Sequence, residues 1–193
     1  MKDYQRICDG LLKASWGYFF LYFDINIQSV SLLPSFIGYI LYLSAIDSLQ
    51  EEERELSLLY RFGGILAVWY GIAWLVSWGS FRLDGAWQFL DIIICLVNLY
   101  FHFQLLTNFA SIAAKYQPDG YDQDAKLLRY RTWQTFMLTA ITIITLLHPW
   151  LSAIWIYISV VMMIVYLIAG ICLMKALYDL RKCLPTGDET LSL

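Results

Sequence analysis

Residues 133–174 read WQTFMLTAITIITLLHPWLSAIWIYISVVMMIVYLIAGICLM and contain no Asp, Glu, Lys or Arg. As one helix, rising 1.5 Å per residue, these 42 residues would extend about 63 Å, roughly twice the hydrocarbon thickness of a bilayer. The run must break at His148-Pro149-Trp150, because proline removes a backbone donor and disfavours helix in the residue before it. The stretch therefore predicts two membrane spans, 133–148 and 151–174, joined by a tight hairpin.

The rest of the chain has the same apolar character. Of its 193 residues, 60% are hydrophobic, 17% aromatic and 15% charged, whereas a soluble domain is nearer half apolar and about a quarter charged. Further apolar stretches predict spans at 11–23, 34–49, 62–78 and 87–106. We expect an all-α fold in which residues 1–193 form one integral membrane domain, a polytopic bundle of six transmembrane helices.

The distribution of Lys and Arg predicts how this bundle is oriented. When six spans are drawn, twelve of the thirteen basic residues lie on one side and only Arg82 lies on the other. Basic residues in short loops remain cytoplasmic. Both termini are therefore expected in the cytoplasm of a multi-pass cell-membrane protein, with the loop at 79–86 outside. Trp78, Trp87 and Trp150 would then form an outer aromatic belt.

Three connecting segments have readable patterns. After the short first span, Asp24, Asn26 and Gln28 alternate with isoleucines, which predicts extended chain in an outer loop or a re-entrant segment. Gln117-Pro118-Asp119-Gly120 is a turn signal, so the fourth and fifth helices should extend past the bilayer into a cytoplasmic elbow at 107–131. The acidic run EEERE at 51–55 is expected to be a solvated loop on the same side.

Several classes of function are disfavoured. The net charge of -3 leaves no basic face for nucleic acid. The four cysteines form no C-x-x-C pair and none falls in an outer loop, so we expect neither a disulfide nor a metal site. The sequence has no H-E-x-x-H, G-x-S-x-G or P-loop motif. We predict no cofactor and no catalytic residue; an intramembrane enzyme would depend on Asp91 and His102 alone.

Polar residues on the fourth span recur at steps of three and four, which keeps them on one helix face. They are Gln88, Asp91, Cys95, Asn98 and His102. An ionisable side chain at membrane depth is costly and normally faces a bundle interior or a wet cavity. The face either contacts a solute or relays a proton, or it forms a structural hydrogen-bond network between helices.

The fifth span has the same spacing at Thr132, Thr135, Thr139, Thr142, Thr145 and His148. Threonine in a membrane helix often donates to the carbonyl four residues earlier, which favours close packing as the interpretation. If this stripe faces Asp91, however, the two would line a polar crevice open to the outer leaflet. The candidate substrate-binding residues are Asp91, Asn98, His102, Thr139, Thr142, His148 and Asp24. On the third span, Gly63, Ala67 and Gly71 form a small-residue ridge that predicts helix packing.

The motifs Phe23-Asp24-Ile25-Asn26-Ile27, Leu33-Pro34 and Gly38-Tyr39 resemble a stretch of small multi-spanning bacterial membrane proteins that have no established activity. In size and topology the chain also resembles the six-helix, substrate-binding S-components of energy-coupling-factor transporters. Their first-helix A-x-x-x-A coupling motif is represented here by Gly10-Leu11-Leu12-Lys13-Ala14, which differs at the first position. This second resemblance implies binding of a small-molecule solute.

Two functions follow as hypotheses. The leading one is a solute-binding or solute-transport component with an outward-facing polar crevice between the fourth and fifth spans. The alternative is a non-catalytic membrane assembly or regulatory subunit, in which the third span and the cytoplasmic elbow bind a membrane-protein partner. Both place the protein in a lipid bilayer, and neither involves nucleic acid.

Overall fold

Six helices make up most of the chain in the computed structural model, which describes residues 4–23, 26–27, 30–31, 34–78, 86–118, 120–147 and 154–183. The only other regular elements in these ranges are two short strands. The elements are α1 (Tyr4–Tyr22), β1 (Asn26–Ile27), β2 (Val30–Ser31), α2 (Ser35–Leu49), α3 (Leu56–Ser77), α4 (Ala86–Tyr116), α5 (Gln123–Leu147) and α6 (Ile154–Cys183). The predicted all-helical architecture is confirmed.

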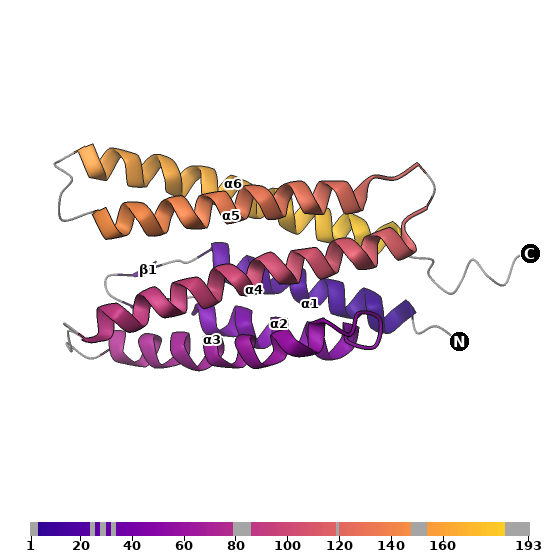
Figure 1. Cartoon of the computed structure of the whole chain (residues 1–193), viewed down its shortest axis with the longest axis horizontal. Coiled ribbons are helices and arrows are strands. Elements are labelled where there is room, and N and C mark those ends of the chain that lie inside the picture. The colour runs from indigo at the N-terminus through magenta and orange to yellow at the C-terminus, as the bar shows by residue number, and fades with distance from the viewer. Residues whose placement is uncertain are drawn as a thin grey trace, which may run out of the picture.

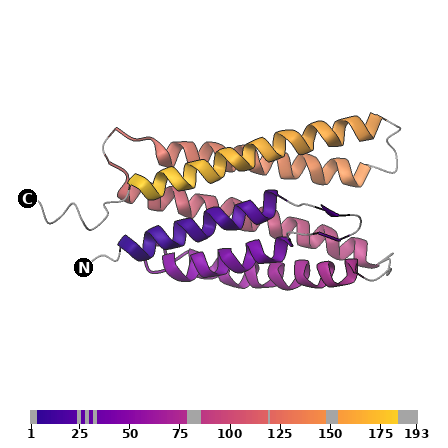
Figure 2. The same ribbon diagram turned by 180° about the vertical axis from the view of Figure 1, so that it is seen from behind.

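The helices run back and forth along one axis (Figures 1 and 2). We call the end at which α1 begins and α6 ends the basal end; the α2–α3 and α4–α5 turns lie there too (Figure 1). The opposite, distal end has β1 and β2. Both views show α1 to α4 grouped together, with the α5–α6 hairpin lying along one side of that group.

Three helices are long and apolar enough to cross a membrane: Leu56–Ser77, Phe89–Tyr116 and Val160–Lys182. Their outward faces expose large apolar side chains such as Val68, Leu96 and Ile164. The α2 helix is apolar but has 15 residues, fewer than the roughly 20 that a span needs. Charged residues interrupt α1, and threonines and a glutamine interrupt α5. Three helices of the described part therefore suit a membrane location, while six complete spans remain a prediction.

The segment between α1 and α2 is extended at Asn26 and Ile27, as the alternation of polar and apolar residues predicts. Asn26 pairs with Ser31 and Ile27 with Val30 in an antiparallel ladder. Pairing satisfies backbone groups that could not face lipid unpaired. Asp24 and Gln28 lie outside the described residues.

Glycines let α1 and α2 approach closely. A Cβ atom added to Gly38 would lie 2.8 Å from the carbonyl oxygen of Gly17, so a side chain there would collide with backbone. On the predicted small-residue ridge of α3, a Cβ on Gly63 would meet Leu43 and Phe101 at 3.0 and 3.1 Å. The ridge at Gly63 therefore packs inside the chain, against α2 and α4.

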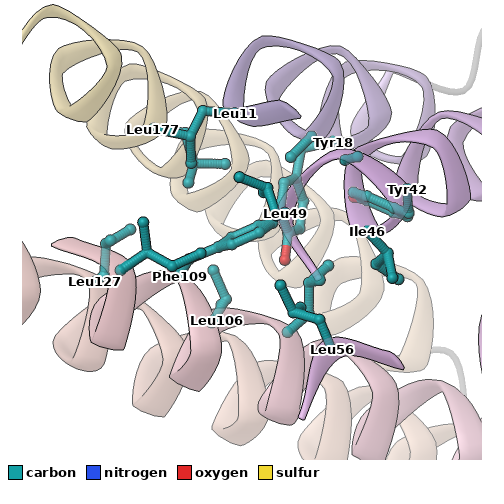
Figure 3. Close-up of a cluster of buried hydrophobic side chains, with 14 of the residues drawn as sticks. Leu11, Tyr18, Tyr42, Ile46, Leu49, Leu56, Leu106, Phe109, Leu127 and Leu177 are labelled. Carbon is teal, nitrogen blue, oxygen red and sulfur yellow. The ribbon is translucent and has the colours of Figure 1, made fainter. Parts of the chain in front are cut away.

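The apolar core joins all six helices in the basal half of the bundle. Figure 3 shows Leu11 of α1 beside Leu177 of α6, and Phe109 of α4 beside Leu127 of α5. Towards the distal end this burial stops: no described side chain is buried in α3 after Leu66, in α4 before Asn98, or in α6 before Gly170. In α5 the last buried side chain within the described part is Met137. The helices thus pass from a packed basal half to a loosely packed distal half.

Candidate functional site

The polar face predicted on α4 runs from an exposed residue into the packed core. Asp91 is exposed and Cys95 is half-buried, whereas Asn98 and His102 are only 9% and 1% exposed. Asp91 and His102 are eleven residues apart, about 16 Å along the helix axis at 1.5 Å per residue, so they do not act as a pair. The side chain of Gln88 lies outside the described residues. The structure therefore divides the stripe into an outer residue, Asp91, and an inner pair, Asn98 and His102.

Asn98 links α4 to α2. The hydroxyl of the fully buried Tyr39 donates a hydrogen bond to Asn98 Oδ1 at 2.7 Å. The Tyr39 ring stacks on Tyr70 of α3, with 5.1 Å between centroids and an interplanar angle of 8°. Tyr70 also lies close enough to Asp91 and Cys95 for electrostatic interaction. Tyr70 is therefore within electrostatic range of the exposed Asp91 and in contact with the tyrosine that bonds to Asn98.

His102 lies among aromatic rings from three helices. Its Nδ1 atom is 3.4 Å from the hydroxyl of Tyr18, and the donor depends on the tautomer. Its ring centroid is 5.5 Å from that of Tyr18, 5.6 Å from Tyr42 and 5.4 Å from Phe101. The other ring nitrogen, Nε2, is buried and has no hydrogen-bond partner in the described part of the protein.

Two further polar side chains next to His102 are buried without partners. Gln134 of α5 is 3% exposed and lies beside the Tyr18 hydroxyl, yet neither its Oε1 nor its Nε2 atom has a hydrogen bond of normal geometry among the described residues. The hydroxyl of Tyr42, whose ring contacts Tyr18 at 5.1 Å, likewise lacks one there. We call Tyr18, Tyr42, His102 and Gln134 the His102 cluster. Buried polar atoms left unpaired cost free energy comparable to a lost hydrogen bond, so this grouping points to an occupant that supplies the missing partners.

Sequence reasoning found His102 but missed the other three members of the cluster. Gln134 directly precedes Thr135 of the predicted threonine stripe, and its position one residue inside an apolar run was the available signal. Tyr18 and Tyr42 look like ordinary aromatic core residues in sequence. Only the packing of α1, α2 and α4 brings their rings together around His102.

The threonines of α5 mostly bond within their own helix. Thr132, Thr135 and Thr142 each donate to the carbonyl four residues earlier, at 2.8 to 3.0 Å, as the packing interpretation predicts. Thr142 Oγ1 also lies 3.0 Å from Cys95 Sγ. Because Thr142 donates its hydrogen to Leu138, the Cys95 thiol is the donor in this contact. Thr139 is exposed, while Asp24, His148 and the Thr145 side chain lie outside the described residues.

The basal end is closed by the acidic run at 51–55. Glu51 pairs with Arg6 of α1 at 2.6 Å, and Glu53 accepts hydrogen bonds from Ser111 and Lys115 of α4 at 2.7 and 3.3 Å. Glu51, Arg54 and Glu55 are exposed, as predicted for a solvated loop, but the acids also bond to neighbouring helix ends, which supply donors that the local sequence does not show.

The predicted elbow is a defined turn. Gln117 Oε1 accepts from the backbone N–H groups of Gln123 and Asp124 at 2.8 and 3.2 Å, which caps the start of α5. Its Nε2 donates to Asp124 Oδ1 at 2.9 Å. The hydrogen bond from Gln117 Nε2, followed by those from the backbone N–H groups of Ala125 and Asp124, holds the pKa of the Asp124 carboxyl below its usual range. Gly120 adopts φ +87°, a conformation that favours glycine.

Comparison of the chain with protein-family models, with curated proteins and with solved structures found no match. Within the described ranges, no group of three or more His, Cys, Asp and Glu side chains is placed to hold a metal ion. We therefore infer function from the geometry of the His102 cluster and its surroundings.

Proposed function

We propose that this multi-pass cell-membrane protein crosses the bilayer six times, with its basal end in the cytoplasm. Every Lys and Arg in the described ranges lies in a basal turn, in the basal half of a helix or, for Lys13, at the middle of α1. Lys13, at the middle of α1, reaches Ser48 near the basal end of α2 at 3.5 Å. Basic residues retained on the cytoplasmic side would give this distribution.

A cysteine introduced at Ser80, between α3 and α4, tests the orientation. We expect it to react with a membrane-impermeant maleimide in intact cells. A cysteine introduced at Gly120 in the elbow should react only after the membrane is permeabilised. The opposite pair of results would invert the proposed topology.

We further propose that the protein binds a small solute from the outer side and serves as a solute-binding or solute-transport component. The observation that supports this most strongly is the set of unpartnered polar atoms in the His102 cluster, at the depth where the packed core ends. The apolar core lies on the basal side of this depth, and the proposed path to the site runs through the less buried distal half. Ligand sites in helix bundles characteristically combine an apolar lining with a few convergent polar groups.

The sequence predicts a crevice lined by α4 and α5 alone. The His102 cluster instead places the proposed site deeper in the bundle, where α1 and α2 also contribute. The contact between Cys95 and Thr142 joins α4 and α5 directly. Within the described ranges, the polar atoms without a hydrogen bond of normal geometry instead come from α2, α4 and α5, around the Tyr18 hydroxyl of α1. Asp91 lies within electrostatic range of Tyr70, whose ring stacks on Tyr39, and would act at the outer mouth of the site.

Small molecules retained by the purified protein test this proposal. We expect mass spectrometry of extracts from detergent-purified protein to find a stoichiometric solute, which His102→Leu and Gln134→Leu should lose. Thr132→Ala provides the control, because Thr132 is exposed near the basal end of α5 and bonds within its own helix. A wild-type protein that retains no more solute per folded molecule than the two cluster variants would contradict a binding role.

The alternative proposal is a non-catalytic assembly or regulatory subunit. It is favoured by the exposed apolar face of α3, where Gly64 has no neighbour within 4 Å of an added Cβ and Val68 and Leu75 are more than 60% exposed. A partner helix could approach closely at Gly64. Co-purification of one stoichiometric membrane protein, lost in Gly64→Leu and kept in His102→Leu, would support this function over solute binding.

A further inference from the structure

We propose that the His102 cluster recognises a small uncharged molecule, or the uncharged end of a larger one, in which a hydrogen-bond donor stands beside an acceptor, as in a carboxamide. The inference rests on the proposed solute-binding function and specifies its ligand class. It is drawn from the types of atom that lack partners and from the position of every nearby charge.

The unpartnered atoms offer both donors and acceptors. Gln134 contributes one of each, a carbonyl oxygen and an amide N–H group, on the same planar end. A carboxamide, which has the same two groups side by side, can pair with both at once. The Tyr42 hydroxyl can donate or accept, and His102 Nε2 does one or the other according to its tautomer. The set as a whole suits a ligand of mixed hydrogen-bonding character.

Charged side chains on the helices that form the cluster are held elsewhere. Lys13 Nζ bonds to Ser48, and Asp47 Oδ1 accepts from Gln50. Arg131, one turn before Gln134, donates to Thr107 Oγ1 at 3.0 Å and covers the Phe103 ring at 4.4 Å. These contacts hold the guanidinium against Thr107 and Phe103 of α4, and its Nε atom is buried there.

On α4 itself the charges are distant. Asp91 precedes His102 by about 16 Å of helix, and Lys115 follows it by about 20 Å and pairs with Glu53. A charged ligand at the cluster would lose its hydration without gaining a counter-ion, which costs several kcal/mol per ion. An uncharged ligand loses only hydrogen bonds to water, and the unpartnered atoms replace them.

Three molecules of nearly equal shape distinguish these cases: acetamide is neutral, acetate is an anion and acetamidinium is a cation. Each is added to the full-length protein in detergent, and unfolding is followed by tryptophan fluorescence. We expect acetamide to raise the melting temperature, because a ligand that binds only the folded state stabilises it. The stabilisation grows with the ratio of the ligand concentration to its Kd. Acetate and acetamidinium should have no such effect at equal concentration.

Two variants locate the effect. Gln134→Met keeps the approximate volume and removes both amide groups, so the acetamide shift should disappear. Tyr42→Phe removes one hydroxyl and should reduce the shift, and it stands in for Gln134→Met if that variant does not fold. Asn108→Leu is the matched control, because Asn108 is also buried with an unpartnered Nδ2 atom but bonds with Gln104 away from the cluster.

The results distinguish a neutral ligand from a charged one. Stabilisation by acetamide alone, lost in Gln134→Met and kept in Asn108→Leu, supports the proposal. Stronger stabilisation by acetate or acetamidinium, or no effect of acetamide up to about 100 mM, overturns it. If a charged solute nevertheless co-purifies and is lost in Gln134→Leu, solute binding stands and only the neutral ligand class is wrong.

Discussion

The distal and basal halves of α4 differ sharply in how deeply their side chains are buried. Between Phe89 and Val97 no side chain is buried, whereas Phe101, Leu105, Leu106 and Phe109 in the basal half are fully buried. Both halves are apolar, so the hydrophobic effect alone does not distinguish them in a bilayer, where lipid also shields apolar side chains. The difference is in burial: the basal half forms the buried core, and the distal half exposes more of its side chains.

The basal half is also where polar contacts tie distant segments together. The run at 51–55 is bonded to α1 and α4, and Gln117 caps α5. Contacts at the distal end include the Cys95–Thr142 pair and the short β1–β2 ladder. Under the proposed function, the basal side stays closed while the distal side admits a solute.

The same substitution at both ends of α4 should give the largest contrast. Phe109→Ala removes a fully buried ring and should destabilise the fold by about 3–5 kcal/mol. Phe89→Ala removes a ring that is 67% exposed and should leave stability nearly unchanged. Denaturation in mixed micelles measures both. Equal losses would show that the distal half packs as tightly as the basal half.

The next largest effect is expected where the two halves meet. Asn98→Leu leaves the fully buried Tyr39 hydroxyl without its acceptor and should cost about 1–3 kcal/mol. In the Tyr39→Phe background both partners are absent, so the same change should cost much less. A double-mutant cycle measures this coupling. Additive effects would mean that Asn98 has another partner.

These expectations also show how far the sequence alone reaches. Pro118 marks the α4–α5 turn and the polar alternation marks the extended chain at Asn26, because both are local backbone effects. The periodicity on α4 identifies Asn98 and His102 as one face. It does not show that Tyr39 is the partner of Asn98 or that Gln134 joins His102, since these contacts depend on how separate helices rotate and cross. Ion pairs between residues far apart in the sequence, such as Glu53 with Lys115, cannot be predicted from local sequence patterns for the same reason.

A smaller effect is expected at the basal end. Lys115→Met removes the ion pair with Glu53, and because Lys115 is 45% exposed the loss should be below about 1 kcal/mol. Ser111 still donates to Glu53 at 2.7 Å and keeps the run at 51–55 in place. The melting temperature in low and high salt checks this, since screening should remove most of the difference. A loss of several kcal/mol would show that this pair is essential for closing the basal end.

The smallest effect on stability, and the most informative for function, is expected at Asp91. Its carboxylate is exposed in the distal half, so Asp91→Asn, which keeps the shape and removes the charge, should leave the melting temperature unchanged. If Asp91 acts at the mouth of the path to the His102 cluster, the variant should take up or release the solute at a different rate, while affinity at equilibrium changes little for an uncharged ligand. His102→Leu should do the reverse and abolish binding at the cluster. Measuring solute retention and exchange kinetics for both variants, per folded molecule, separates the two roles. If Asp91→Asn abolishes equilibrium binding as completely as His102→Leu does, the ligand is held at the distal charge, and the neutral interior site is not where it binds.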